Sequence, residues 1–290
     1  MFVFVLFILI GAALAGLNYW GLGLYHQWYW FWTVPLFWLM YFLATSAAYI
    51  VILYIFSLLI ARDKDKVYPP SRPTMWIIKQ TTFLILKVLR VKVHAKGLGK
   101  LPKKGVAMAI MHNHLSMFDE FVLASVLKTP LLFISKPSNL NIPVAGAFMR
   151  KAGYLPIIQG DMANGQKVIA DSVELIKKGN SIVIAPEGTR NKDFPNPILL
   201  PFHAGSFHLA LDSKAPIALF SLQNTNVIVK RFPVGTHVYL DCVGVIYEDE
   251  YASLSPKELA DKCREMIENK LENKKARSYH VRKKNEKEED

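Results

Sequence analysis

The chain has 290 residues, 52% of them hydrophobic, and a formal net charge of +12 at pH 7. Its only cysteines are Cys242 and Cys263, which argues against a disulfide-rich secreted scaffold and fits a reducing compartment. A basic balance can indicate nucleic-acid binding, but no zinc-ligand spacing, RNA-binding signature or helix-turn-helix pattern accompanies it here. We therefore expect no nucleic-acid partner.

The amino-terminal part of the chain is uncharged, because no Asp, Glu, Lys or Arg precedes Arg62. A single helix of these roughly 60 residues would be about 90 Å long, whereas the hydrocarbon core of a bilayer is about 30 Å thick. Two membrane spans are therefore predicted rather than one. They cover residues 2–17 and 34–61, and the aromatic residues between them suit a membrane–water interface. A cleaved signal peptide is the alternative for the first segment and a buried core helix for the second. Residues 1–66 are thus predicted to form a membrane hairpin.

The residues after the second span are basic. By the positive-inside rule, this places the following domain and both ends of the hairpin on the cytoplasmic face of the membrane. Cations beside a membrane also favour an anionic lipid surface as a partner. The basic residues are Arg62, Lys64, Lys66, Arg72 and Lys79.

A proline-rich break, VYPPSRP, is predicted to end the second helix near Lys66. Residues 74–90 are apolar with basic residues at Lys79, Lys87 and Arg90. This pattern predicts a helix lying in the membrane interface, with a core helix as the alternative.

From about Lys92 onward, short apolar runs alternate with helical patterns, which predicts an α/β domain. An amphipathic helix contains Ile169, Val173 and Ile176, and Ser255–Glu258 is a capping box that opens a last helix to about Asn273. The domain is predicted to cover residues 67–273, followed by a charged tail, 274–290, that is either disordered or membrane-associated. The predicted strands are Val106–Met111, Leu131–Ser135, Tyr154–Ile158, Ser181–Ala185, Pro216–Phe220 and Thr236–Val245.

The segment HNHLSMFDE, residues 112–120, follows a predicted strand and precedes a predicted helix. The carboxyl ends of strands are where α/β sheets form their sites. Ser116 and Asp119 have the spacing of a helix cap, so a purely structural role is one interpretation. If His114 lies in the loop and Asp119 in the first helical turn, the carboxylate can instead orient the imidazole as a general base. With no Ser or Cys nucleophile beside it, such a base would activate a substrate hydroxyl.

A second polar segment, PEGTR, follows the predicted strand SIVIA. Gly188 allows an anion to approach the backbone, Thr189 offers a hydroxyl, and Arg190 can bind phosphate with its planar fork. A turn with a surface salt bridge is the alternative. Lys136 and Arg150 contribute only if the fold brings them to the same cleft. No further metal-ligand histidine pattern supports a nuclease of the HNH type, and no metal is expected.

These motifs resemble those of the glycerolipid acyltransferases typified by lysophosphatidic acid acyltransferase, in the same order along the chain. N-H-x4-D is matched by Asn113, His114 and Asp119, and P-E-G-T-R by residues 186–190. FISKPSN, AGAFMRKAGYLPI and PFHAGSFHLALDSKAPIALF resemble the remaining motifs, so the resemblance covers roughly residues 75–245.

The resemblance implies a membrane-tethered α/β acyltransferase fold, with a mixed sheet flanked by helices. It also implies transfer of a fatty acyl group from acyl-CoA or acyl carrier protein to the sn-2 hydroxyl of lysophosphatidic acid, giving phosphatidic acid, with no cofactor beyond this co-substrate. His114 and Asp119 would be catalytic. The implied substrate-binding residues are Lys136, Arg150, Glu187, Gly188, Thr189 and Arg190.

The chain departs from the family pattern at two places. Gln159 stands where an Arg is frequent, and His203 or Ala204 where a Lys is frequent. Both changes remove positive charge near the expected headgroup site. Glycerol-3-phosphate, another lysophospholipid or a glycolipid therefore remains open as the acceptor, as does a non-catalytic lipid-binding protein with the same fold.

Overall fold

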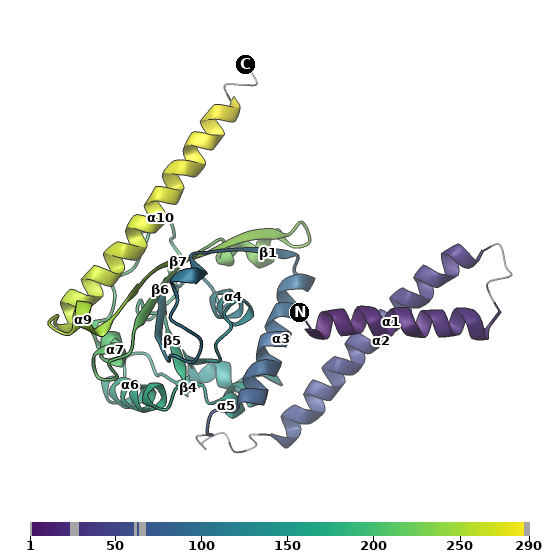
Figure 1. Cartoon of the computed structure of the whole chain (residues 1–290), viewed down its shortest axis with the longest axis horizontal. Coiled ribbons are helices and arrows are strands. Elements are labelled where there is room, and N and C mark those ends of the chain that lie inside the picture. Colours follow the sequence, from purple (N-terminus) through teal and green to yellow (C-terminus); the bar gives the residue numbers. More distant parts are fainter. Residues whose placement is uncertain (1, 24–28, 61–62, 64–67, 287–290) are drawn as a thin grey trace.

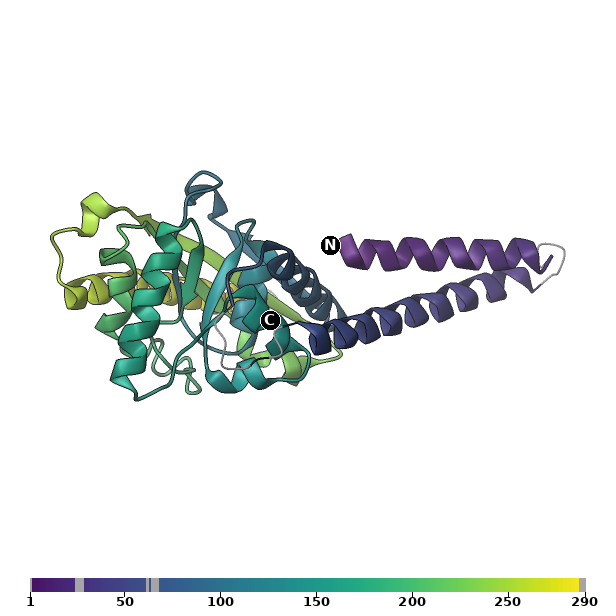
Figure 2. The same ribbon diagram turned by 90° about the horizontal axis from the view of Figure 1, so that it is seen from below.

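The computed structural model describes residues 2–23, 29–60, 63 and 68–286, with the side chains of residues 30, 31 and 273–286 excepted. Two amino-terminal helices, α1 (Phe2–Gly21) and α2 (Trp30–Leu59), run side by side and extend away from an α/β domain (Figures 1 and 2). Both are long and apolar enough to cross a membrane, and none of the most apolar window of α2 is buried in the protein.

The two helices of the hairpin contact each other closely. Trp38 donates a hydrogen bond to the carbonyl of Ile8 at 3.4 Å, and the rings of Phe7 and Tyr49 lie 5.4 Å apart. A Cβ atom at Gly11 would lie 3.3 Å from the backbone of α2, so a small residue is needed at this crossing. Helix α2 ends at Leu59, two residues before the predicted end of the second span at residue 61. The helix stop predicted near Lys66 lies outside the described residues.

Helix α3 (Arg72–Val88) lies between the hairpin and the sheet (Figure 1). One face, including Met75 and Leu86, is buried against the domain. The other side carries Trp76, which is 48% exposed and whose ring lies 6.1 Å from that of Phe2 at the start of α1. The helix predicted over residues 74–90 is therefore present, and its buried face belongs to the core of the domain.

The sheet has seven strands in the order β1-β7-β6-β2-β5-β3-β4. All neighbours are parallel except β6 and β7, so β1 and β7 run opposite to the other five strands and the sheet is mixed, as predicted. The strands are β1 (Val91–Lys96), β2 (Ala109–His112), β3 (Leu131–Ser135), β4 (Leu155–Pro156), β5 (Ser181–Ile184), β6 (Ile217–Gln223) and β7 (Thr236–Ile246).

The predicted strands differ from the observed ones at several points: β2 begins at Ala109 and not at Val106, and β6 continues past Phe220 to Gln223. Strand β1 was not predicted, although VKVHAK alternates apolar and polar residues as a half-buried strand does. Strand β4 covers only two of the five residues predicted from Tyr154 to Ile158. Pro156 lacks the N–H needed to continue a ladder of hydrogen bonds, which shortens this edge strand.

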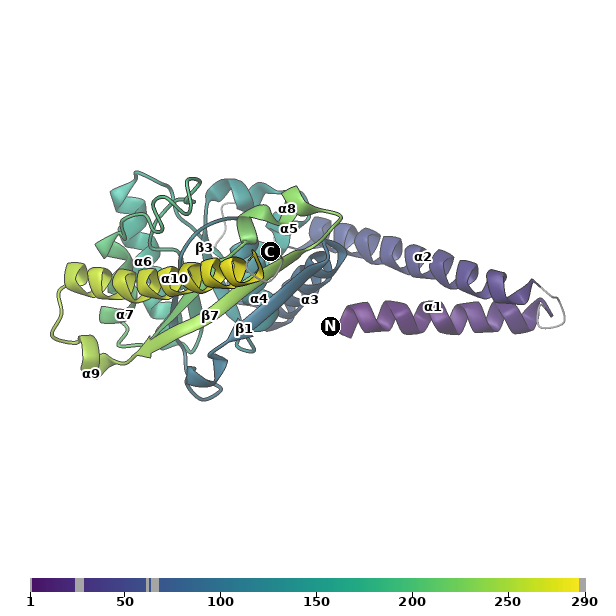
Figure 3. The ribbon, with the colours of Figure 1, turned by 90° about the horizontal axis from the view of Figure 1, so that it is seen from above.

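Helices cover both faces of the sheet. One apolar cluster joins the sheet to side chains of α6 and α10, among them Val173, Ile176 and Cys263, and the other joins it to α3 and α4 through Leu86 and Leu123. Figure 3 shows α10 lying across the sheet, with the hairpin leaving the domain at the end far from α9. The remaining α-helices of the described residues are α4 (Phe118–Val126), α5 (Ala145–Ala152), α6 (Met162–Lys177), α7 (His208–Leu211), α8 (Ile228–Arg231), α9 (Glu248–Tyr251) and α10 (Pro256–Glu286).

Helix α10 continues thirteen residues past its predicted end at Asn273. The charged segment from residue 274 to Glu286 is therefore part of this helix. Its lysine and glutamate residues are good helix formers, which explains why a segment unable to form a core can still be helical.

Candidate active site

The loop after β2 is fixed at its first residue. Asn113 is fully buried, and its side-chain amide donates to the carbonyl of Leu222 at 3.0 Å, while the Leu222 N–H donates to the amide oxygen at 2.7 Å. This pair of bonds joins the carboxyl ends of β2 and β6, which are parallel neighbours. Asn113 therefore holds the backbone from which His114 projects.

His114 and Asp119 are in direct contact. Nδ1 of His114 lies 2.9 Å from Oδ2 of Asp119, so the ring donates from Nδ1 and Nε2 is left as the proton-accepting atom. The backbone N–H groups of Leu115 and Ser116 donate to the same carboxylate oxygen at 2.8 Å each. The structural and catalytic interpretations of this segment are therefore compatible, because the carboxylate that orients the imidazole also fixes the loop that leads into α4.

The other oxygen of Asp119 is also occupied. Thr225, which follows β6, donates its hydroxyl to Oδ1 of Asp119. Both side chains are almost fully buried. Thr225 was not identified from the sequence because it lies outside every recognised motif, and only the pairing of β2 with β6 brings it to the site.

Glu187 of the PEGTR segment is buried, and both of its oxygens accept backbone hydrogen bonds. The N–H of His114 donates to one at 2.7 Å and the N–H of Leu200 donates to the other at 2.9 Å. The N–H of Asn191 in turn donates to the carbonyl of His114 at 2.8 Å. Glu187 was predicted to bind substrate; it lines the cavity described below, and these contacts also fix the loop that carries His114.

The surroundings shift the pKa values of several side chains at the site, and burial raises that of Glu187. Burial lowers the pKa of His114, but the hydrogen bond to Asp119 and the charges of Glu120 and Asp119 more than offset it, so the net pKa is raised. Burial lowers the pKa of His112 to about 4, which keeps that ring neutral near pH 7. Burial and the neighbouring Asp119 raise the pKa of Glu120 to about 7.

A cavity of about 950 Å³ opens beside His114. One part of its wall is apolar, formed by Phe133, Ile157, Ile158, Ile169 and Val183. The polar part brings together His114, Glu120, Lys136, Gly188, Thr189 and Arg190. The cavity therefore combines a surface suited to an aliphatic chain with one suited to a charged headgroup.

Arg150 does not line this cavity. It lies on α5 and its guanidinium donates to the carbonyl of Leu140. On the same helix, a Cβ atom at Gly146 would lie 2.1 Å from the same carbonyl oxygen. The motif that contains Gly146 and Arg150 thus packs α5 against the backbone at Leu140.

Both departures from the family pattern contact Gly188. The Gln159 side chain donates to the Gly188 carbonyl, and a Cβ atom at Gly188 would lie 2.8 Å from the His203 ring. Gly188 also has φ +66, a conformation that favours glycine. An amide and an imidazole therefore border the predicted anion loop where cations are frequent in the family.

Among the described residues, no group of three or more His, Cys, Asp or Glu side chains is arranged to hold a metal ion.

A family model described as Acyltransferase matches residues 91–222. The chloroplastic 1-acyl-sn-glycerol-3-phosphate acyltransferase of Brassica napus is 32% identical over 176 residues, which cover 61% of this chain and 50% of that protein. The 1-acyl-sn-glycerol-3-phosphate acyltransferase of Salmonella typhimurium is 32% identical over 162 residues, covering 55% and 64%. The chain thus spans about half to two thirds of the length of these relatives.

The fold is also that of a solved structure. The crystal structure of the 1-acyl-sn-glycerophosphate (LPA) acyltransferase PlsC from Thermotoga maritima matches 81% of this chain and 93% of its own, with a TM-score of 0.60 and 20% identity. At this identity the likeness concerns the fold. Residues 91–222, which match the Acyltransferase family model, carry the N-H-x4-D and P-E-G-T-R motifs in the expected places.

Proposed function

We propose that the protein is a membrane-anchored O-acyltransferase that acylates the sn-2 hydroxyl of lysophosphatidic acid. The observation that carries this proposal is the 2.9 Å contact between His114 and Asp119 at the edge of a cavity that also holds Lys136 and Arg190. The named activity of the relatives from Brassica napus and Salmonella typhimurium supports the same assignment.

In the proposed reaction, Nε2 of His114 takes the proton of the acceptor hydroxyl while its oxygen attacks the thioester carbonyl of the donor. The carbon–sulfur bond breaks, and the thiolate leaves with the proton that His114 releases. Asp119 keeps Nδ1 protonated and stabilises the imidazolium that forms between these steps. The donor is a fatty acyl thioester, carried by coenzyme A or by acyl carrier protein.

The two kinds of cavity wall suit the two parts of a lipid substrate. Lys136 and Arg190, with the backbone at Gly188 and Thr189, would bind the phosphate of the acceptor. The apolar wall that includes Phe133 and Ile169 would hold an acyl chain. Arg150 has no part in this scheme.

The hairpin would anchor the enzyme where its acceptor resides. A lipid with one acyl chain stays in the bilayer, so a site at headgroup depth meets it directly. The basic residues that follow α2, among them Arg72 and Lys79, support a cytoplasmic domain facing an anionic surface.

A different acceptor is a second candidate, and the cavity wall motivates it. Besides two cations, the wall carries the carboxylates of Glu120, Asp161 and Asp212, and uncharged Gln159 contacts the anion loop. Such a mixture would also suit a headgroup that carries a cation or several hydroxyls.

The test is acyl transfer by the purified full-length protein in lipid, with labelled acyl-CoA and acyl carrier protein as donors. The acceptors are lysophosphatidic acid, glycerol-3-phosphate, lysophosphatidylethanolamine and a lysoglycolipid. Preferred turnover of lysophosphatidic acid, lost in His114→Ala, is expected. If only another acceptor were acylated, that acceptor would take the place of lysophosphatidic acid as the proposed substrate. If His114→Ala turned over the acceptor as fast as the unsubstituted protein, the mechanism would be refuted.

A further inference from the structure

An exposed surface that combines apolar and basic side chains lies outside the cavity. The segment from α8 to the start of β7 reads VKRFPV, residues 229–234, and every one of these residues is exposed. Val229, Phe232 and Val234 are 64%, 50% and 76% exposed, with Lys230 and Arg231 between them. This segment follows the last residue of the matched family domain, Leu222.

The end of α3 extends this surface. Gly235 packs on the turn after α3, since a Cβ atom there would lie 2.8 Å from the Arg90 carbonyl oxygen, and the Thr236 N–H donates to the same oxygen at 3.4 Å. Val88 is 62% exposed at this turn, with Lys87 and Arg90 exposed beside it. We call the set Lys87, Val88, Arg90 and residues 229–234 the tip surface.

The tip surface has four cations and no acidic residue. No Asp or Glu occurs between Asp65 and Asp119, or between Asp212 and Asp241, so neither of its two segments brings a compensating charge. Exposed valine and phenylalanine flanked by lysine and arginine is the pattern of a segment that inserts into the headgroup region of an anionic bilayer. A nucleic-acid surface would share the cations but gain nothing from the exposed side chains of Val88, Val229, Phe232 and Val234.

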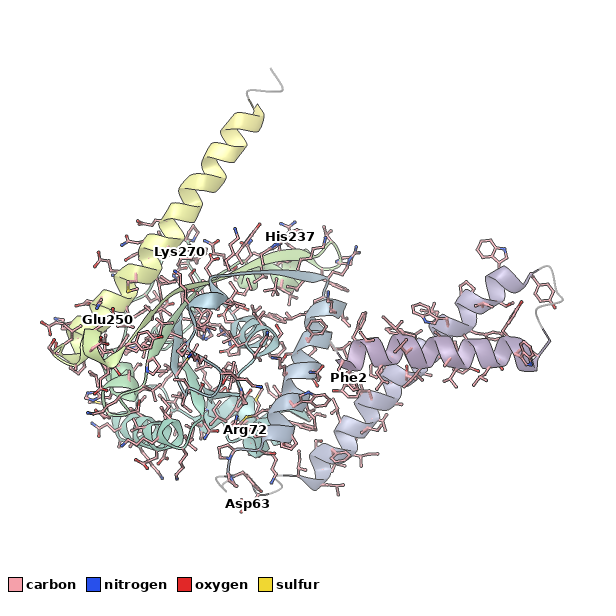
Figure 4. The ribbon with its side chains drawn as sticks, in the orientation of Figure 1. Phe2, Asp63, Arg72, His237, Glu250 and Lys270 are labelled. Carbon is pink, nitrogen blue, oxygen red and sulfur yellow. The ribbon has the colours of Figure 1, made fainter. Side chains whose placement is uncertain are left out.

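The tip surface lies beside the hairpin and beside the site. Figures 1 and 3 show the connection between α8 and β7 at the end of the domain from which the hairpin extends. Figure 4 shows Arg72 and His237 toward opposite ends of α3, with Phe2 facing the helix between them. Thr225, whose hydroxyl bonds to Asp119, lies four residues before Val229, and β7, which follows the tip surface, pairs antiparallel with β6, so the tip surface lies toward the same edge of the sheet as the site.

We propose that the tip surface is a second membrane contact, which docks on anionic phospholipid while the hairpin anchors the chain. A single attachment leaves the tilt of the domain undefined, whereas two separated contacts define it. Docking at the tip would set the domain so that the cavity beside His114 meets the headgroup layer. The proposal relies on the membrane anchorage proposed above, but not on the identity of the acceptor.

The experiment measures how deeply three positions enter the bilayer. Full-length protein is reconstituted into vesicles of phosphatidylcholine with about 30% phosphatidylglycerol, and a fluorescent probe is attached at Val234→Cys, Leu43→Cys or Lys257→Cys. Leu43 is an exposed residue of α2 that reports anchorage, and Lys257 is an exposed residue of α10 that serves as the control. The native Cys242 and Cys263 are buried, and unsubstituted protein corrects for their labelling.

Spin-labelled lipids that quench near the headgroups are expected to quench the probe at 234 and not the probe at 257. Iodide should do the reverse. The pair Lys230→Gln and Arg231→Gln should lower the ratio of docked to undocked probe by about fivefold for each cation, whereas Lys177→Gln with Lys178→Gln should leave it unchanged.

If spin-labelled lipid quenches the probe at position 43, the chain is anchored. Equal quenching by iodide of the probes at 234 and 257 would then overturn the proposal. Lack of quenching at position 43 would instead refute the anchorage. Protection at 234 that depends on protein concentration and not on lipid would identify a contact between two copies of the chain, and it too would overturn the proposal.

Discussion

Thr225 donates its hydroxyl to Oδ1 of Asp119, so a residue outside every recognised motif supports the carboxylate that orients His114. Oδ2 of the same carboxylate accepts from the imidazole and from two backbone N–H groups. Losing a hydrogen bond to a buried charged group costs about 1.5–3 kcal/mol. The Thr225 contact is therefore expected to matter for the reaction.

In Thr225→Val, we expect kcat to fall about tenfold to hundredfold while the KM for the acceptor changes little, because the imidazole loses orientation rather than substrate contacts. Thr225→Ser keeps a hydroxyl and should retain most of the activity. Steady-state kinetics with a lysophosphatidic acid series would measure the split. A normal kcat in the valine variant would remove Thr225 from the supporting network.

His114→Ala should reduce kcat by about 100- to 10,000-fold, the usual contribution of a general base. Asp119→Asn should be impaired as well, because an amide can present its N–H toward Nδ1 and favour the wrong tautomer. Binding of an unreactive thioether analogue of the acyl donor should persist in His114→Ala and can be followed by calorimetry. Loss of that binding would mean that the variant is misfolded or that His114 holds the donor.

The activity should depend on Glu120 in a pH-dependent way. His114 must be neutral to accept a proton, and its raised pKa means that kcat/KM rises as the pH increases through that pKa. Glu120, with a pKa of about 7, helps to hold the proton on His114. Glu120→Gln removes this charge, so the pKa of His114 should fall and the acid limb of the profile should move to lower pH.

Asp119, Glu187 and Arg190 also face His114, and they are unchanged in Glu120→Gln. The matched control is Asp161→Asn, which alters another carboxylate of the cavity wall that does not influence the pKa of His114. A shift of the same size in both variants, or no shift in Glu120→Gln, would contradict the assignment.

Sequence patterns identified the site better than its supports. Strand β3 and the pair His114–Asp119 were predicted correctly, because local apolar runs and a five-residue spacing are visible along the chain. Thr225 could not be found, since its role depends on the pairing of β2 with β6. The two backbone hydrogen bonds of Glu187 could not be predicted either, because they come from loops that only the fold brings together.

Arg190 and Arg150 should behave differently although both were predicted to bind phosphate. Arg190 lines the cavity, so Arg190→Ala is expected to raise the KM for lysophosphatidic acid, with a smaller effect on the acyl donor. Arg150→Ala should leave that KM near normal and lower stability, because its guanidinium bonds to the Leu140 carbonyl. If Arg150→Ala raised the acceptor KM as much as Arg190→Ala, Arg150 would also bind the acceptor, and the binding site would extend beyond the cavity described here.

The motif around Gly146 should likewise prove structural. In Gly146→Ala the new methyl group would lie 2.1 Å from the Leu140 carbonyl oxygen, and a backbone atom cannot move aside cheaply. Overpacking of this kind typically costs about 1–3 kcal/mol. The free energy of unfolding in urea, measured in detergent, should fall by that amount, with the acceptor KM unchanged in the folded enzyme.

Gly165→Ala is the matched control, because α6 has open space at that position and alanine favours the helix by up to about 1 kcal/mol. Equal stability of the two variants would show that α5 does not need its close contact with the backbone at Leu140.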